Sequence, residues 1–205
     1  MKKITALFVS FIVLIILSSC NSYTPEEKEY ISTIEDRRNI TDEWMKDDPN
    51  SPFNYKGEVE FHDLNYFDVN PDLVFTSKIA EYDEKKEIAI FGTKGEERSA
   101  IRFGYLSFNN DGKDHKLNLY ANQGQDSSWY YSIWFTDQTT NNESYGVGRY
   151  LSFDLEQDKE HIYTIDFNLA FNPYCAYSPD YSCAIPSKED YLDLEVTAGE
   201  KIFHD

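Results

Sequence analysis

Three patterns of apolar and polar residues follow one another along this chain. Residues 4–17 form an almost unbroken apolar run, which Lys2 and Lys3 precede. Residues 24–46 repeat apolar side chains at helical spacing, and from residue 73 onward apolar and polar side chains alternate. The sequence therefore predicts an apolar N-terminal segment, then one helix, then a domain of strands.

The apolar run has the features of an export signal. Residues 17–20 read Leu-Ser-Ser-Cys, so small side chains stand directly before Cys20. As a helix the run would span about 21 Å, short of the roughly 30 Å hydrocarbon core of a bilayer, which indicates a cleaved signal over residues 1–19. The pattern resembles the bacterial lipobox, whose cysteine is acylated, with palmitate for instance, and becomes the first mature residue. We expect lipidation of Cys20, a tether over residues 20–23, and attachment to a membrane of the cell envelope.

Residues 24–46 begin with a helix-capping motif. Thr24 is expected to cap the helix, and Glu27 stands three residues later, where it closes a capping box. The stripe of this helix that would face the domain contains apolar residues but also Arg37 and Arg38. Such arginines either lie along the packing surface with their charge in solvent or meet a buried carboxylate.

The alternating part of the chain predicts an all-β fold. The predicted strands cover residues 73–82, 87–93, 100–108, 115–121, 129–136, 145–155, 161–167 and 191–197. The clearest hairpin turns at Asp111-Gly112. Short successive strands with few helices between them indicate a mainly antiparallel sandwich or barrel with one N-terminal α-helix. No second domain boundary is visible, so residues 24–205 are predicted to form a single domain.

Composition excludes one class of partner. Without the predicted signal, the chain carries 17 basic and 37 acidic side chains, a formal charge near −20. Such a chain is repelled by nucleic acid and by anionic headgroups, so no nucleic-acid partner is expected. Aromatic residues make up 16% of the chain, which favours a packed globule over disorder.

Two cysteines remain after Cys20. Cys175 and Cys183 are expected to form a disulfide, because the chain leaves the reducing cytosol. Two buried free thiols are the first alternative, and a catalytic Cys175 served by His161 is a second. The spacing lacks the tight ligand pairs of a zinc site, so no metal and no cofactor are predicted.

The predicted site lies in the last third of the chain. Alternation puts Arg149 on the same face as Leu151 and Phe153, where a guanidinium needs a partner. Asp137 and Asp166 are the nearest plausible carboxylates along the sequence. Arg149 either pairs with one of them to fix how the strands meet, or faces an anionic group of a ligand.

Two further features have a structural and a functional interpretation. Asn168 and Asn172 flank a turn, where they either cap backbone groups or line a polar pocket. Trp129, Tyr131 and Trp134 either pack in the core or form an exposed aromatic surface. The motifs of serine hydrolases, zinc proteases and nucleotide-binding proteins are missing from the sequence, so no catalytic residue is assigned.

The same C-terminal residues carry a family resemblance. They comprise Asp137-x-Thr139, Ser144 to Leu151, Ile165 to Ser178, Tyr181 to Pro186 and Ala198-Gly199-Glu200-Lys201. In these residues the chain resembles the family called domain of unknown function 1684, and weaker similarity extends over most of the mature chain. Ala184 stands where the family usually has proline, and Asn141 where it tends to have glycine. The resemblance implies a shared fold and a shared set of residues, but no reaction.

Three hypotheses follow for the function. In the first, the lipid-anchored β domain binds a small ligand or an envelope partner without catalysis, and Asp137, Arg149, Asp166, Asn168 and Asn172 line the site. In the second, it is an envelope hydrolase that uses Asp137 or Asp166 together with Arg149. In the third, it is a structural or assembly lipoprotein that uses its aromatic surface against another envelope protein.

Overall fold

Two antiparallel sheets and one helix make up the fold. The computed structural model describes residues 23–55, 59–124 and 126–204, so the predicted export signal and Cys20 lie outside the described residues. The elements in chain order are α1 (Pro25–Asp47), β1 (Val74–Ser77), β2 (Ile79–Phe91), β3 (Glu97–Asn110), β4 (Lys113–Gln123), β5 (Trp129–Phe135), β6 (Arg149–Phe153) and β7 (Tyr163–Asp166), with short 3₁₀ turns between some of them. The prediction of a mainly antiparallel all-β fold with one N-terminal helix is confirmed.

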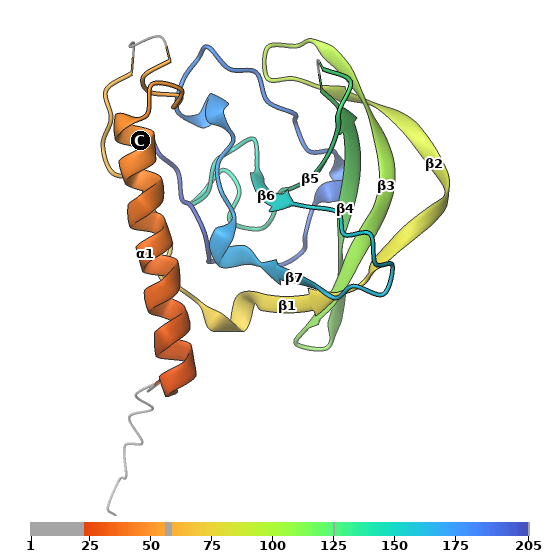
Figure 1. The fold of residues 1–205 in the computed structure, drawn as a ribbon, viewed down its shortest axis with the longest axis horizontal. Helices are drawn as coiled ribbons and strands as arrows, with labels where there is room; N and C mark the ends of the chain where they lie inside the picture. The colour runs from red at the N-terminus through yellow and green to blue at the C-terminus, as the bar shows by residue number, and fades with distance from the viewer. Residues whose placement is uncertain (1–22, 56–58, 125, 205) are drawn as a thin grey trace, which may run out of the picture.

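The helix begins where its sequence indicates. The Thr24 side chain accepts a hydrogen bond from the backbone of Glu27, whose carboxylate accepts one from the backbone of Thr24, so the capping box is complete. Ile34 and Met45 are its buried residues. Figure 1 shows α1 lying along one side of the β domain, facing β6 and β7. No described helix is both long enough and apolar enough to cross a bilayer.

The larger sheet has the order β2-β3-β4-β5-β6, and β1 pairs with β7 in a separate two-stranded sheet. The tight hairpin between β3 and β4 turns at Asp111 (φ 49°) and Gly112 (φ 80°), the left-handed conformations that such a turn requires. Strands β2 to β4 are long and strongly curved (Figure 1), and their ladders carry two register shifts, one of them between Arg102 and Gly104.

Four predicted strands differ from the structure. The strand predicted over residues 145–155 is shorter, because only Arg149–Phe153 pairs with β5. The first predicted strand is divided at Lys78, because Val74–Ser77 pairs with β7 whereas Ile79–Phe91 pairs with β3. The second predicted strand is the continuation of β2. The predicted strand over residues 191–197 was wrong: this segment is irregular, because its backbone groups bond to the end of β5 and to buried side chains instead of to a neighbouring strand.

The sheets enclose the main core. Its central residues are fully buried and come from β3, β4, β5, β7 and the C-terminal segment; they include Leu106, Leu119, Phe135, Ile165 and Val196. A second cluster packs on the opposite face of the five-stranded sheet, where Tyr120 stacks on Trp134 with ring centroids 4.3 Å apart. The larger sheet is therefore covered on both faces, and the two faces border different cavities.

Candidate functional site

Arg149, the first residue of β6, is fully buried with Asp137 as its ion-pair partner. Its Nη2 lies 2.9 Å from Asp137 Oδ2. The guanidinium also donates to the backbone carbonyls of Val196 at 2.8 Å, of Glu200 at 3.2 Å and of Ala198. These bonds hold the irregular C-terminal segment against the sheet, which explains why residues 191–197 form no strand.

Asp137 is just as enclosed. Its Oδ1 accepts hydrogen bonds from the backbone and the hydroxyl of Thr139, at 2.8 and 2.6 Å. The guanidinium of Arg149 lies between the rings of Phe67 and Phe135, with its central carbon 5.5 Å from each centroid. The pair is therefore surrounded by protein and lines none of the cavities described below.

Asp166 and Asn168 lie elsewhere and hold α1 in place. The Tyr30 hydroxyl, on α1, donates to both carboxylate oxygens of Asp166, at 2.9 and 2.8 Å. Asn168 donates to the Asn70 carbonyl at 2.8 Å and accepts from the Asn70 backbone at 2.7 Å. Burial and the bond to Asp166 raise the pKa of Tyr30 well above its usual value, so it remains a hydrogen-bond donor.

Asn172 bonds to a residue that the sequence analysis did not propose as a site residue. Its backbone donates to Glu200 Oε2 at 2.8 Å, and its side chain donates to the carbonyl of Lys201 at 2.7 Å. The Tyr177 hydroxyl donates to the same Glu200 oxygen. The five predicted residues therefore do not form one cluster: Arg149 pairs with Asp137, Asp166 bonds to Asn168, and Asn172 bonds to Glu200, whose backbone carbonyl also accepts from Arg149.

Glu200 is a buried carboxyl with an altered titration. It is 3% exposed, and burial raises its pKa from 4.5 to about 7, against the opposite effect of the bonds from Tyr177 and Asn172. Glu200 follows Gly199, which has a φ of +75°, and a Cβ at this position would lie only 2.5 Å from the Ala170 carbonyl oxygen, so only glycine fits. The one feature of the sequence that could have indicated Glu200 is the glycine directly before it, because a glycine favours a tight turn and the acid follows that turn.

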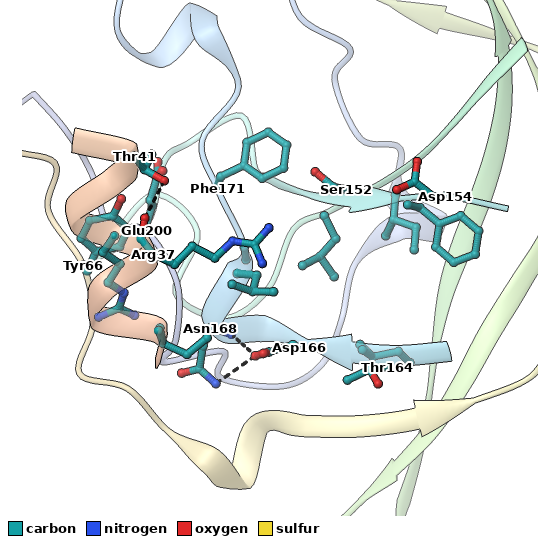
Figure 2. A pocket seen from close by; sticks show the side chains of 18 of the residues that line it. Arg37, Thr41, Tyr66, Ser152, Asp154, Thr164, Asp166, Asn168, Phe171 and Glu200 are labelled. Atoms are coloured by element: carbon teal, nitrogen blue, oxygen red, sulfur yellow. Dashed lines mark hydrogen bonds between the residues drawn. The ribbon is translucent and has the colours of Figure 1, made fainter. Parts of the chain in front are cut away.

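A cavity of about 540 Å³ lies between α1 and the strands β6 and β7. We call it the α1 cavity. Its floor consists of core residues, namely Leu106, Ile133, Leu151 and Ile165, and its polar lining includes Arg37, Thr41, Ser152, Asp166, Asn168 and Glu200. Figure 2 shows the labelled side chains of both walls around this space. Ligand pockets typically occupy ~300–1,000 Å³ and combine such an apolar lining with a few polar groups.

The two inward-facing arginines of α1 behave differently. Arg38 donates to the Phe67 carbonyl at 2.9 Å and lies 4.5 Å above the ring of Tyr66. Its Nε and Nη2 are buried without a hydrogen-bond partner among the described residues, and burial lowers its pKa. Arg37 is exposed, makes no side-chain hydrogen bond or ion pair within the described chain, and extends from α1 into the cavity (Figure 2). The cavity thus carries guanidinium donors that have no partner among the described residues.

The cysteine pair lies in another part of the domain. Cys175 and Cys183 are free thiols, and the Cys175 backbone donates to Cys183 Sγ at 3.2 Å. The hydrogen bond from Cys183 lowers the pKa of the Cys175 thiol from 9.0 to about 7. The predicted disulfide stays a prediction, which this close contact makes feasible. Within the described residues, no group of three or more histidine, cysteine, aspartate or glutamate side chains is arranged to hold a metal ion.

The predicted aromatic surface is largely used for packing. Trp134 is buried against Tyr120, and Tyr131 packs against Phe103 with ring centroids 5.1 Å apart. Trp129 is exposed, as is its neighbour Tyr130. The three residues named from the sequence therefore form no continuous exposed patch.

The fold and the site define a two-sheet β domain with a ligand-sized cavity, one wall of which is an N-terminal helix. Comparison with known proteins then gives the family. The chain belongs to the family described as Protein of unknown function (DUF1684), whose model matches residues 59–201. It is also similar to an uncharacterised protein of Haloarcula marismortui solved by NMR, with 27% identity and a TM-score of 0.59, over 86% of this chain and 96% of that one. No curated protein matches.

Proposed function

We propose that this protein is a lipid-anchored cell-envelope protein that binds a small anionic amphiphile in the α1 cavity. The ligand has a carboxylate head and an apolar body. One observation carries the proposal: the guanidinium of Arg37, which has no partner among the described residues, extends into a cavity whose floor is made of buried aliphatic side chains. Support for the anchor comes from the sequence, in which a short apolar run ends at Cys20.

The lining favours an anionic head over a cationic one. Arg37 has no partner within the described chain, and two nitrogens of Arg38 lack one. The carboxylates of Asp166 and Glu200, by contrast, already accept hydrogen bonds from the protein, and the third lining carboxylate, Asp154, is exposed just past β6, away from Arg37 (Figure 2). A ligand carboxylate would satisfy donors that are otherwise idle, and guanidinium–carboxylate pairs form two parallel hydrogen bonds.

The hydrolase hypothesis gains no such support. It required Arg149 and an aspartate to reach a substrate, but Arg149 and Asp137 are occupied by each other and by the C-terminal backbone. Asp166 reaches the α1 cavity without Arg149. The assembly hypothesis also lacks support, because it required an exposed aromatic surface, and Tyr131 and Trp134 pack against Phe103 and Tyr120.

Isothermal titration calorimetry tests the proposal on the chain from residue 21, which contains every described residue. Hexanoate, octanoate and decanoate are expected to bind with rising affinity, since each buried CH₂ contributes about 0.8 kcal/mol, or about fourfold. Arg37→Met should weaken octanoate binding about tenfold, the loss of one charge-assisted contact. Lys28→Met is the matched control, because Lys28 is exposed on α1 and does not line the cavity.

Two results would contradict this function. One is the absence of binding by all three carboxylates. The other is equal octanoate affinity for Arg37→Met and the native chain, which would show that the unpaired guanidinium is not the head-group contact.

A further inference from the structure

A second cavity lies on the opposite face of the five-stranded sheet. It has a volume of about 810 Å³ and is lined by residues of all five strands and of the segment 171–184. We call it the outer cavity. Its sheet side includes Asn122, Tyr130, Ser132, Trp134 and Tyr150.

The segment 171–184 forms a strap across this face of the sheet. At one end, Phe171 exchanges two backbone hydrogen bonds with Tyr150 of edge strand β6, at 2.9 and 3.0 Å. At the other end, the Cys183 carbonyl accepts from Thr93, just past edge strand β2, at 3.0 Å. Because both edges of the sheet hold the strap, the outer cavity is built into the fold.

The lining of the outer cavity is aromatic, hydroxylic and amidic. Tyr130 is 53% exposed and points to the same face as Trp134, four residues further along β5. Between them lies Ser132, whose hydroxyl accepts a hydrogen bond from the Asn122 amide at 2.7 Å. Tyr174 and Ser182 are among the residues that the strap contributes to the lining.

The charge in the outer cavity is already neutralised. Arg98 is its only charged lining residue in the described chain, and it pairs with Glu96 and donates to the Ser182 carbonyl at 3.1 Å. The α1 cavity, with its unpaired guanidinium, differs in this respect. The two cavities therefore suit different ligands, and the outer cavity suits a neutral one.

We infer that the outer cavity binds a neutral saccharide. The apolar C–H face of a sugar ring packs on an aromatic ring, and its hydroxyls need neutral donors and acceptors around the ring edge. Tyr130 supplies the exposed ring face, whereas Trp134 is buried behind it; the Ser132 hydroxyl and the amide oxygen of Asn122 supply the polar contacts. A phosphorylated ligand is disfavoured, because no unpaired cation among the described residues lines this cavity.

The test titrates the chain from residue 21 with maltotriose, cellotriose and N,N′-diacetylchitobiose, followed by NMR shifts of backbone amides. At least one sugar is expected to shift amides of β5 and of the strap. Tyr130→Ala should weaken its binding about tenfold, and Tyr130→Phe should retain it, because phenylalanine keeps the ring face. Trp129→Ala is the matched control: Trp129 is equally exposed and adjacent, but lies on the other face of β5 and does not line the cavity.

Thermal unfolding of each variant verifies that it is folded. The inference is overturned if none of the three sugars binds, if Tyr130→Ala binds as the native chain does, or if Trp129→Ala loses as much affinity as Tyr130→Ala. Because the carboxylate titrations address the α1 cavity, either proposal can fail without the other.

Discussion

Replacing Glu200 by glutamine is expected to stabilise the protein above neutral pH and to leave its stability nearly unchanged in acid. Burial raises the pKa of this carboxyl from its usual 4.5 to about 7. Between these two values the folded chain holds a proton that the unfolded chain has lost, so stability falls as the pH rises through about 7. The pKa difference corresponds to about 3 kcal/mol. Glutamine keeps an oxygen for the bonds from Tyr177 and Asn172 and has no charge to bury.

Urea unfolding of the chain from residue 21, at about pH 5 and about pH 8.5, measures this effect. The Glu200→Gln variant should exceed the native chain by about 3 kcal/mol at the higher pH, or about 6–12 °C in melting temperature, and by little at the lower pH. Glu195→Gln is the control, because Glu195 is an exposed glutamate of the same segment. Equal stability of Glu200→Gln and the native chain at both pH values would refute the reasoning, since the buried carboxyl would then carry no penalty for ionisation.

Three other outcomes are expected. Arg149→Met should destabilise the fold by about 3–5 kcal/mol in urea unfolding, because it leaves Asp137 buried and unpaired; a loss under 1 kcal/mol would contradict this. The exported protein should contain a Cys175–Cys183 disulfide, seen by mass spectrometry with and without reduction, and worth about 2–3 kcal/mol; free thiols in that sample would exclude it. Cys20→Ala should release the protein from the membrane fraction, whereas persistent membrane attachment would argue against the lipid anchor.

Local features of the fold could be predicted because neighbouring residues determine them. The capping box of Thr24 and Glu27 fixes the start of α1, and Asp111-Gly112 fixes the hairpin between β3 and β4. Alternation along residues 149–153 also placed Arg149 and Leu151 on the buried face, as observed. In each case the signal lies within a few residues, so no knowledge of distant segments was needed.

The predicted strand over residues 191–197 shows where local signals fail. Its alternating pattern is compatible with a strand, but within the described residues it forms a single isolated bridge, between Tyr191 and Thr136 just past β5. The carbonyl of Val196 instead accepts from Arg149, and the backbone of Leu192 donates to Thr136. The backbone of this segment thus bonds to distant side chains and loops instead of to a neighbouring strand. The residues of the segment alone could not indicate this, because strand propensity depends on tertiary context.

The sequence by itself determined the helix, most strands, and the need of Arg149 for a partner, and it predicts an N-terminal export signal. Only the tertiary structure decided which carboxylate that partner is, and that Asp166 and Asn168 bond to α1 instead. It also decided that Arg37 extends into the α1 cavity and that Glu200, another residue of its lining, is buried. The reason is physical: a side chain's chemistry depends on its burial and partners, and these come from segments far apart in the chain.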